Sequence, residues 1–177
     1  MRCMNEHRHL DDLGKTNIAS ECLVIRNEKV LMFKRSETSK KFPGFWIGPG
    51  GHIDENEDPM LAAIREIQEE AGVSVGMEDI KLKAIATHFH VDLNETWISF
   101  VFLAKIDKDQ DTSEENDEGK AHWIPLKELL TMDNVFPPSK YYFDHVLNDK
   151  PGIMYANITW NKAQLVEVRS QRVDKNG

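Results

Sequence analysis

The chain has 177 residues, enough for one domain with a full hydrophobic core. Hydrophobic residues make up 40% and charged residues 29%, which is typical of a globular protein, and no apolar run reaches membrane-spanning length. The formal net charge of −8 argues against a protein that tracks nucleic-acid phosphates, because such proteins usually carry a basic surface. An acidic protein can still act on phosphates when a divalent cation lies between the two.

The N-terminal residues are polar and lack the apolar segment of a secretion signal. We therefore expect residues 1–15 to be a loose lead-in and residues 16–177 to form a single domain. Cys3 and Cys22 lie in no metal-binding or redox spacing, which is typical of reduced thiols in a cytoplasmic protein. We expect no membrane and no nucleic-acid polymer among its partners, and either a monomer or a homodimer.

In chain order, apolar runs bounded by turn signals predict strands at residues 17–25, 30–34, 80–91, 97–106 and 121–125. The residues RNEK between the first two runs indicate a hairpin. The glycine-rich turn GPGG, at 48–51, predicts backbone that passes close to another group or takes positive φ. Helical segments are predicted at residues 59–71, 126–131 and 138–147. Strands mixed with few helices predict an α/β layered fold with a mixed sheet.

The helix predicted from Pro59 to Ala71 carries a row of acids. Proline suits its first turn, and a glycine follows directly as a left-handed stop. Because a helix advances about 100° per residue, Glu66, Glu69 and Glu70 share one face while an apolar stripe faces the core. Solubility is the ordinary reason for a surface glutamate. However, like charges at this spacing destabilise an isolated helix by roughly 0.2–0.5 kcal/mol per pair. A hard divalent cation would reverse that repulsion, and oxygen ligands favour Mg²⁺ or Mn²⁺ over zinc.

This segment resembles the Nudix box, G-x5-E-x7-R-E-U-x-E-E-x-G-U, where U is a bulky aliphatic residue. Every fixed position matches: Gly51, Glu57, Arg65, Glu66, Ile67, Glu69, Glu70, Gly72 and Val73. The Pro-Gly-Gly approach and the later WIPLKEL are also similar to this family. The resemblance implies the Nudix α/β/α sandwich with a mixed β-sheet. It also implies a MutT-like hydrolase acting on a nucleoside diphosphate linked to another moiety.

The resemblance also implies roles for the box residues. Glu66, Glu69 and Glu70 would hold Mg²⁺, or Mn²⁺, with the carbonyl of Gly50 as a further ligand. One of these carboxylates, Glu66 by preference, would act as general base on the attacking water. Glu57 would orient the helix or a water, and Arg65 would fix the geometry between loop and helix by charge-assisted bonds to carboxylate.

Two further residues resemble functional positions of relatives. Many of these supply an additional glutamate just before a W-x-P sequence, which makes Glu118 a candidate metal ligand; Glu114 and Glu115 compete for the role. Arg35 resembles an arginine that some relatives direct at substrate phosphates. A solvated acidic loop and a surface cation are the alternatives.

The C-terminal part is distantly similar to nucleoside triphosphatases that remove oxidised purines. In these an aromatic–proline pair precedes two acids that read the base edge. Here Phe136 and Pro137 form the pair, and Pro138 and Ser139 stand in place of the acids. We expect Phe136 to stack on a base and Ser139 to be a further substrate contact. Without the two acids, a preference different from or broader than 8-oxo-dGTP is left open.

The expected reaction is Mg²⁺-dependent cleavage of a nucleoside triphosphate to a monophosphate and pyrophosphate. The alternatives are an ADP-ribose or sugar-nucleotide pyrophosphatase and a non-catalytic nucleotide sensor, although sensors typically lose box carboxylates and this chain keeps them. A third alternative is isomerisation of a prenyl diphosphate on the same fold; that variant usually has a disrupted box and a catalytic cysteine, and neither feature is evident here. His88 and His90 share one strand face, where they either line a pocket or form local hydrogen bonds.

Overall fold

A long hairpin is the first regular structure in the chain. The computed structural model describes residues 14–113, 115–162 and 164–173. Strands β1 (Lys15–Arg26) and β2 (Lys29–Arg35) are joined by Asn27 and Glu28, whose φ angles are 48° and 60°. Two successive positive φ angles suit the twist of a tight antiparallel hairpin. The hairpin predicted from RNEK is therefore confirmed.

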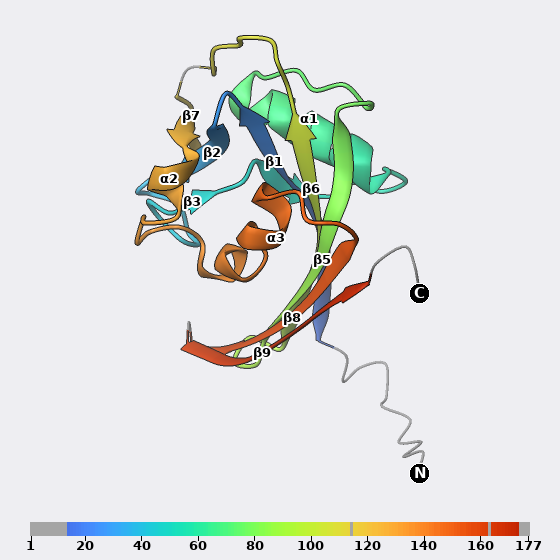
Figure 1. Ribbon diagram of the computed structural model, residues 1–177. Coiled ribbons are helices and arrows are strands. Elements are labelled where there is room, and N and C mark those ends of the chain that lie inside the picture. Colours follow the sequence, from blue (N-terminus) through green and yellow to red (C-terminus); the bar gives the residue numbers. More distant parts are fainter. Residues whose placement is uncertain (1–13, 114, 163, 174–177) are drawn as a thin grey trace.

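All the strands of the described residues join one mixed sheet (Figure 1). Its order is β3-β2-β1-β6-β5-β8-β9, with β4 paired to β1 and β7 paired to β2. The pairs β1–β6 and β5–β8 are parallel, and the others are antiparallel. The remaining strands are β3 (Trp46–Ile47), β4 (Gly50–His52), β5 (Ile80–His90), β6 (Glu95–Lys105), β7 (Gly119–Pro125), β8 (Ile153–Asn161) and β9 (Gln164–Val173).

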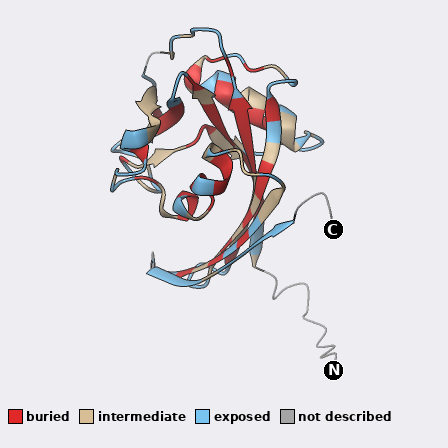
Figure 2. Ribbon diagram, in the orientation of Figure 1, coloured by how far each residue is buried: buried red, intermediate tan, exposed pale blue. Residues whose placement is uncertain are grey.

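Helices cover both faces of this sheet, and the buried residues lie between the layers (Figure 2). Alternate residues of β1 divide between two cores, as the two-residue period of a strand requires. Cys22 and Val24 pack with α1 (Pro59–Ala71), whereas Leu23 belongs to the core on the opposite face. That second core is covered by α2 (Leu126–Leu129), the 3₁₀ helix η2 (Pro137–Tyr141) and α3 (Phe143–Leu147). The predicted α/β layers with a mixed sheet are confirmed.

Helix α1 has the bounds that the sequence predicts. Asp58 caps its start by accepting hydrogen bonds from the backbone N–H groups of Met60 and Leu61, at 2.8 and 3.4 Å. Gly72 ends it with a φ of 68°, and its N–H donates to the carbonyl of Gln68 at 3.0 Å. These caps satisfy backbone groups that a helix end leaves unpaired.

Three features differ from the predictions. The helical segment predicted at 138–147 is divided at Tyr142, where φ is −120°. The short strand predicted at 121–125 begins earlier, at Gly119. No strand is predicted from the sequence where β8 and β9 lie; these two strands join the sheet by pairing with β5 and with each other.

The predicted lead-in lies almost wholly outside the described residues. No helix in the described ranges is both long and apolar enough to cross a membrane.

Candidate functional site

Two glycines of β4, at the end of the glycine-rich turn, lie against β1 and the helix. A Cβ atom at Gly50 would lie 2.3 Å from the backbone oxygen of Ser20, and one at Gly51 would lie 2.4 Å from Oε1 of Glu66. Neither glycine has a positive φ. Close approach is therefore the reason for glycine at both positions, and at Gly51 the group approached is a carboxylate of the box.

Arg65 joins the box loop to the helix. Its guanidinium donates from Nε and Nη2 to the two carboxylate oxygens of Glu57, at 2.8 and 2.9 Å. Nη1 also donates to Glu66 at 2.9 Å and to Glu69 at 3.2 Å, and Nη2 donates to the carbonyl of His52 at 3.1 Å. The bidentate pair lowers the pKa of Glu57 to about 2. The guanidinium of Arg65 thus fixes the loop against the helix and neutralises part of the negative charge of the box.

Glu70 lies between the loop and the helix, largely out of water. Its Oε2 accepts a hydrogen bond from the backbone N–H of Gly50 at 3.0 Å. Burial raises the pKa of Glu70 to about 8; the Gly50 N–H opposes the rise, and the charges of Glu66 and Glu118 add to it. Burial also raises the pKa of Glu66. Adjacent acids that resist ionisation mark a place where positive charge would be stabilised.

Glu118 and Arg35 approach the box from neighbouring strands. The carbonyl of Glu118 accepts a hydrogen bond at 2.8 Å from the residue after Arg35, which ties β7 to the end of β2. Both side chains act electrostatically on Glu70, Arg35 in the opposite sense. The charge of Glu115 instead affects His122 of β7. Glu114 lies outside the described residues. Of the acids expected to compete here, Glu118 is the one with a described electrostatic effect on the box.

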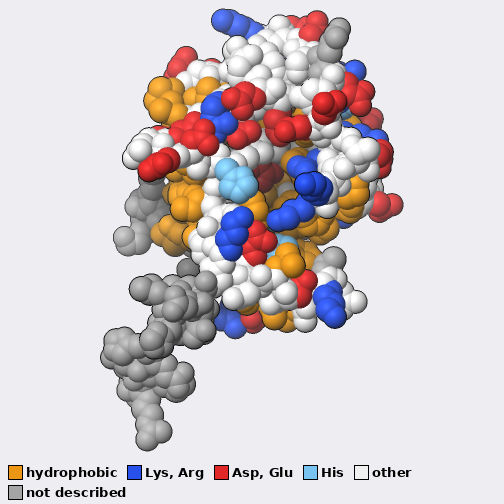
Figure 3. Space-filling model, turned by 180° about the vertical axis from the view of Figure 1, so that it is seen from behind, with side chains coloured by type: hydrophobic (Ala, Val, Ile, Leu, Met, Phe, Trp, Pro, Cys, Tyr) orange, Lys and Arg blue, Asp and Glu red, His pale blue; other side chains and the backbone are white. Residues whose placement is uncertain are grey.

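The oxygen atoms at this site suit a hard divalent cation. Glu66, Glu69 and Glu70 offer carboxylates, and Gly50 offers a carbonyl from the loop. Within the described ranges, no three acidic, histidine or cysteine side chains already converge as a metal site. Two of the carboxylates accept bonds from Arg65, and the third accepts from the loop N–H. A bound cation would compete with those bonds. On the face in Figure 3, acidic side chains gather in the upper half of the molecule.

The sheet face opposite α1 carries aromatic side chains close to the same loop. The N–H of Phe136 donates to the carbonyl of Trp46 at 2.8 Å, just before the glycine-rich turn. The ring of Phe136 lies 4.8 Å from that of Phe42 and 6.3 Å from that of His88, between centroids. His88 is buried and its Nδ1 has no hydrogen-bond partner. Burial lowers the pKa of His88 to about 4, so the imidazole is neutral near pH 7.

A buried network lies beneath the loop. Ser139 is fully buried, and its Oγ lies 3.0 Å from Oη of Tyr142, which donates to Oε2 of Glu21 at 2.6 Å. The other oxygen of Glu21 has no partner, and burial raises the pKa of this acid to about 7. A Cβ at Gly48 would lie 2.6 Å from that oxygen. Glu21 is not among the residues predicted from the sequence, although an acid within the apolar run NIASECLVI is a signal that could have indicated it.

Comparison with known proteins agrees with this geometry. The model of the NUDIX domain matches residues 16–146. An uncharacterised Nudix hydrolase, YvcI of Bacillus subtilis, is 25% identical over 158 residues, covering 88% of this chain and 92% of that protein. An RNA pyrophosphohydrolase of Sphingopyxis alaskensis is 30% identical over 148 residues, covering 74% of this chain and 90% of that protein.

Among solved structures, a MutT protein from Bacillus halodurans superposes with a TM-score of 0.75 and 23% identity, covering 88% of this chain and 97% of that one. The similarity of the two structures establishes the fold of this chain, which is the Nudix α/β/α sandwich. Nudix hydrolases generally use divalent metal ions, which the carboxylates and carbonyl of the box would suit. The chain belongs to the Nudix family and is a pyrophosphohydrolase.

Proposed function

We propose that the protein cleaves a nucleoside triphosphate to a nucleoside monophosphate and pyrophosphate in a Mg²⁺-dependent reaction. The observation that carries this proposal is the position of the glycine-rich loop. On one side the loop meets Glu66 and Glu70 of the box. On the other side Trp46, just before the loop, accepts a hydrogen bond from Phe136, whose ring lies 6.3 Å from that of the buried His88. A bound nucleotide would therefore lie across this loop, with its phosphates next to the acids and its base next to the aromatic rings.

In this proposal Glu66, Glu69, Glu70 and the Gly50 carbonyl hold the cation. When bound, Mg²⁺ supplies charge neutralisation and polarisation at the phosphates. Glu66 accepts a proton from the attacking water, and Glu57 holds Arg65 so that the loop keeps its place. Glu118 offers another oxygen. Arg35, whose Nε donates to a loop carbonyl at 2.9 Å, keeps its other guanidinium nitrogens for substrate phosphates.

Base recognition would rest on stacking against Phe136, with His88 beside that ring; His88 is itself buried, so it would contact a base directly only if Phe136 moved aside. Since Ser139 is buried and bonded to Tyr142, a direct contact with substrate would require that network to open. Pro138 has no polar side chain to read a base edge. These features support a nucleotide preference that is different from or broader than oxidised guanine, with Ser139 positioning the segment that carries Phe136.

A substrate panel tests the reaction. Purine and pyrimidine triphosphates, 8-oxo-dGTP, ADP-ribose, a nucleotide sugar and a dinucleoside polyphosphate would be incubated with Mg²⁺, with pyrophosphate and phosphate measured separately. A 5′-triphosphorylated oligoribonucleotide belongs in the panel, because the chain is 30% identical to an RNA pyrophosphohydrolase. We expect the highest kcat/KM for a free nucleoside triphosphate. Preferential cleavage of ADP-ribose or of the oligonucleotide, or tight binding without cleavage, would overturn the proposal.

Two substitutions test the metal site. Glu69→Gln and Glu70→Gln each remove a negative charge but keep the shape, so we expect turnover to fall at least about 10–100-fold with the fold unchanged. Isothermal titration calorimetry with Mg²⁺ should show a matching loss of affinity. Glu55→Gln, at an exposed acid in the same loop, is the control. Near-normal turnover of both variants in saturating Mg²⁺ would reject the assignment.

A further inference from the structure

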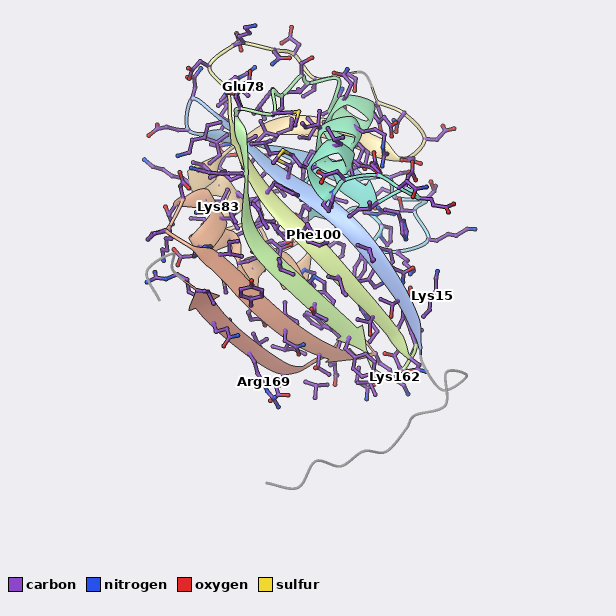
Figure 4. The ribbon with its side chains drawn as sticks, turned by 90° about the vertical axis from the view of Figure 1, so that its right-hand side faces the viewer. Lys15, Glu78, Lys83, Phe100, Lys162 and Arg169 are labelled. Carbon is purple, nitrogen blue, oxygen red and sulfur yellow. The ribbon has the colours of Figure 1, made fainter. Side chains whose placement is uncertain are left out.

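The last two strands extend the sheet beyond the part of the chain that the family model matches, which ends at residue 146. Strand β8 adds in parallel to β5, and β9 adds antiparallel to β8. As a result β9 becomes the outer edge of the sheet (Figure 4). None of the box or substrate-binding residues of the proposed function lies on this hairpin, so the residues of β9 are free of that function.

Strand β9 is exposed along nearly its whole length. Of its ten residues, one is partly buried and the others are exposed (Figure 2). They include apolar side chains: Leu165, Val166 and Val173 are 43%, 61% and 55% exposed. Within the described ranges, no strand pairs with the outer side of β9. A long edge with free backbone donors and acceptors readily pairs with another strand, unless charge or shape prevents it.

The charges on β9 decide which strand fits. Glu167 and Arg169 lie two residues apart on the same face and pair with each other, Nε to Oε1 at 2.8 Å and Nη2 to Oε2 at 3.0 Å. An exposed ion pair of this kind stabilises a protein by only about 0–1 kcal/mol. Replacing the pair within one strand by an equivalent pair between two strands is therefore nearly neutral in free energy. Because the two charges are opposite and symmetric about Val168, the strand is complementary to an antiparallel copy of itself.

We infer that β9 pairs antiparallel with β9 of a second copy of this chain, about a two-fold axis at Val168. In this register Glu167 lies opposite Arg169 of the partner subunit, and the reverse pair forms as well. The overlap spans residues 164–172, and its centre, residues 167–169, lies in the regular part of the β8–β9 ladder on both strands. The two sheets become one continuous sheet, and both copies keep their catalytic faces uncovered at the other end of the sheet.

Other registers are less favourable. A two-fold axis at Glu167 or at Arg169 would place two like charges opposite each other, which destabilises a strand pair. The regular part of the β8–β9 ladder begins at Glu167, after a bulge, and a two-fold axis at Ser170 would lie at the centre of this regular part. In that register, however, no ion pair would form across the interface. Charge complementarity therefore selects Val168.

Charge reversal tests this interface. Sedimentation velocity of the full chain over a wide concentration range should show a monomer–dimer equilibrium. Glu167→Arg and Arg169→Glu should each weaken the dimer by about 10-fold or more in Kd, since two symmetric pairs become repulsive. An equimolar mixture of the two variants should recover dimerisation as a heterodimer, and the double variant should recover it as a homodimer.

Matched controls are Glu128→Arg and Lys127→Glu, which make the same changes in net charge on the exposed side of α2. They should leave the equilibrium unchanged. A wild-type chain that stays monomeric at all concentrations overturns the inference. So does a dimer that is insensitive to both reversals, or a mixture that fails to associate. Nucleotide hydrolysis does not enter these measurements, so the proposed function and this interface can fail independently.

Discussion

At the scale of single residues, three buried side-chain atoms in the described ranges lack hydrogen-bond partners: Oε1 of Glu21, Nδ1 of His88 and Nε1 of Trp160. Strand pairing and the alternation of side chains place all three on the sheet face opposite α1. An unpaired buried polar atom costs roughly 1–3 kcal/mol. Each such group calls for an explanation, and one of the three, His88, lies beside Phe136, with 6.3 Å between the ring centroids, at the proposed base site.

His88→Leu tests this interpretation, because it should separate stability from activity. Removing an unpaired buried imidazole in favour of an apolar side chain is expected to leave the melting temperature unchanged or higher. The kcat/KM for the best substrate should fall about 10-fold, through KM rather than kcat, if His88 binds the base. Thermal unfolding and steady-state kinetics would be measured on the same preparations. A large loss of stability with unchanged kcat/KM would assign His88 to packing.

Glu21→Gln should change how stability depends on pH. The pKa of Glu21 is about 7 in the folded chain against an ordinary value of 4.5, so its contribution is fully favourable below pH 4.5 and is lost as pH rises to 7. That shift corresponds to ~3 kcal/mol. The variant should lose less stability than the wild type between pH 4.5 and pH 8, by urea unfolding without added metal. Parallel curves for the two proteins would show that Glu21 does not titrate in this range.

At the scale of elements, α1 is specified locally. Its cap, its terminal glycine and its apolar stripe lie within one short segment, and the structure has the predicted bounds. The segment at 138–147 shows the opposite case: its apolar residues fit one helix, but Tyr142 bonds to Glu21 on a distant strand and the helix is interrupted there. A contact between residues far apart in sequence cannot be read from local periodicity.

Asp58→Ala should destabilise α1 from its start. The side chain accepts from two backbone N–H groups that otherwise have no partner in the helix, so its loss should lower the free energy of unfolding by ~1 kcal/mol. Urea unfolding followed by circular dichroism would measure this, with Glu55→Ala as the control at an exposed acid nearby. Equal midpoints for the two variants would mean that the cap contributes nothing measurable.

At the scale of the whole molecule, the β8–β9 hairpin forms an edge of the sheet (Figure 1) and also contributes side chains to the core. Ala156, Ile158 and Trp160 of β8 are buried in the same cluster as Ala84 and Ala86 of β5. Without β8, the edge of β5 and this apolar surface would be exposed to water. The chain from residue 16 onward is therefore expected to unfold as one unit.

Removal of residues 148–177 tests this expectation. The shortened chain should lose its cooperative thermal transition or aggregate, because burial stabilises by roughly 25 cal/mol per Å² of apolar surface and much of the second core would be opened. Removal of residues 174–177 alone is the control and should leave the transition in place. A shortened chain that stays monomeric and melts sharply would make the hairpin an accessory to an independent domain.

The sequence by itself determined the helix of the box, its acidic face, the first hairpin and the family, because each depends on residues close together in the chain. Only the tertiary structure decided that β8 and β9 complete the sheet, that Glu118 approaches Glu70, and that Glu21 lies under the glycine-rich loop. These depend on strand pairing between distant segments and on burial. Burial also sets the pKa values of about 7 for Glu21 and about 8 for Glu70, because a carboxylate loses its water only when the fold closes over it.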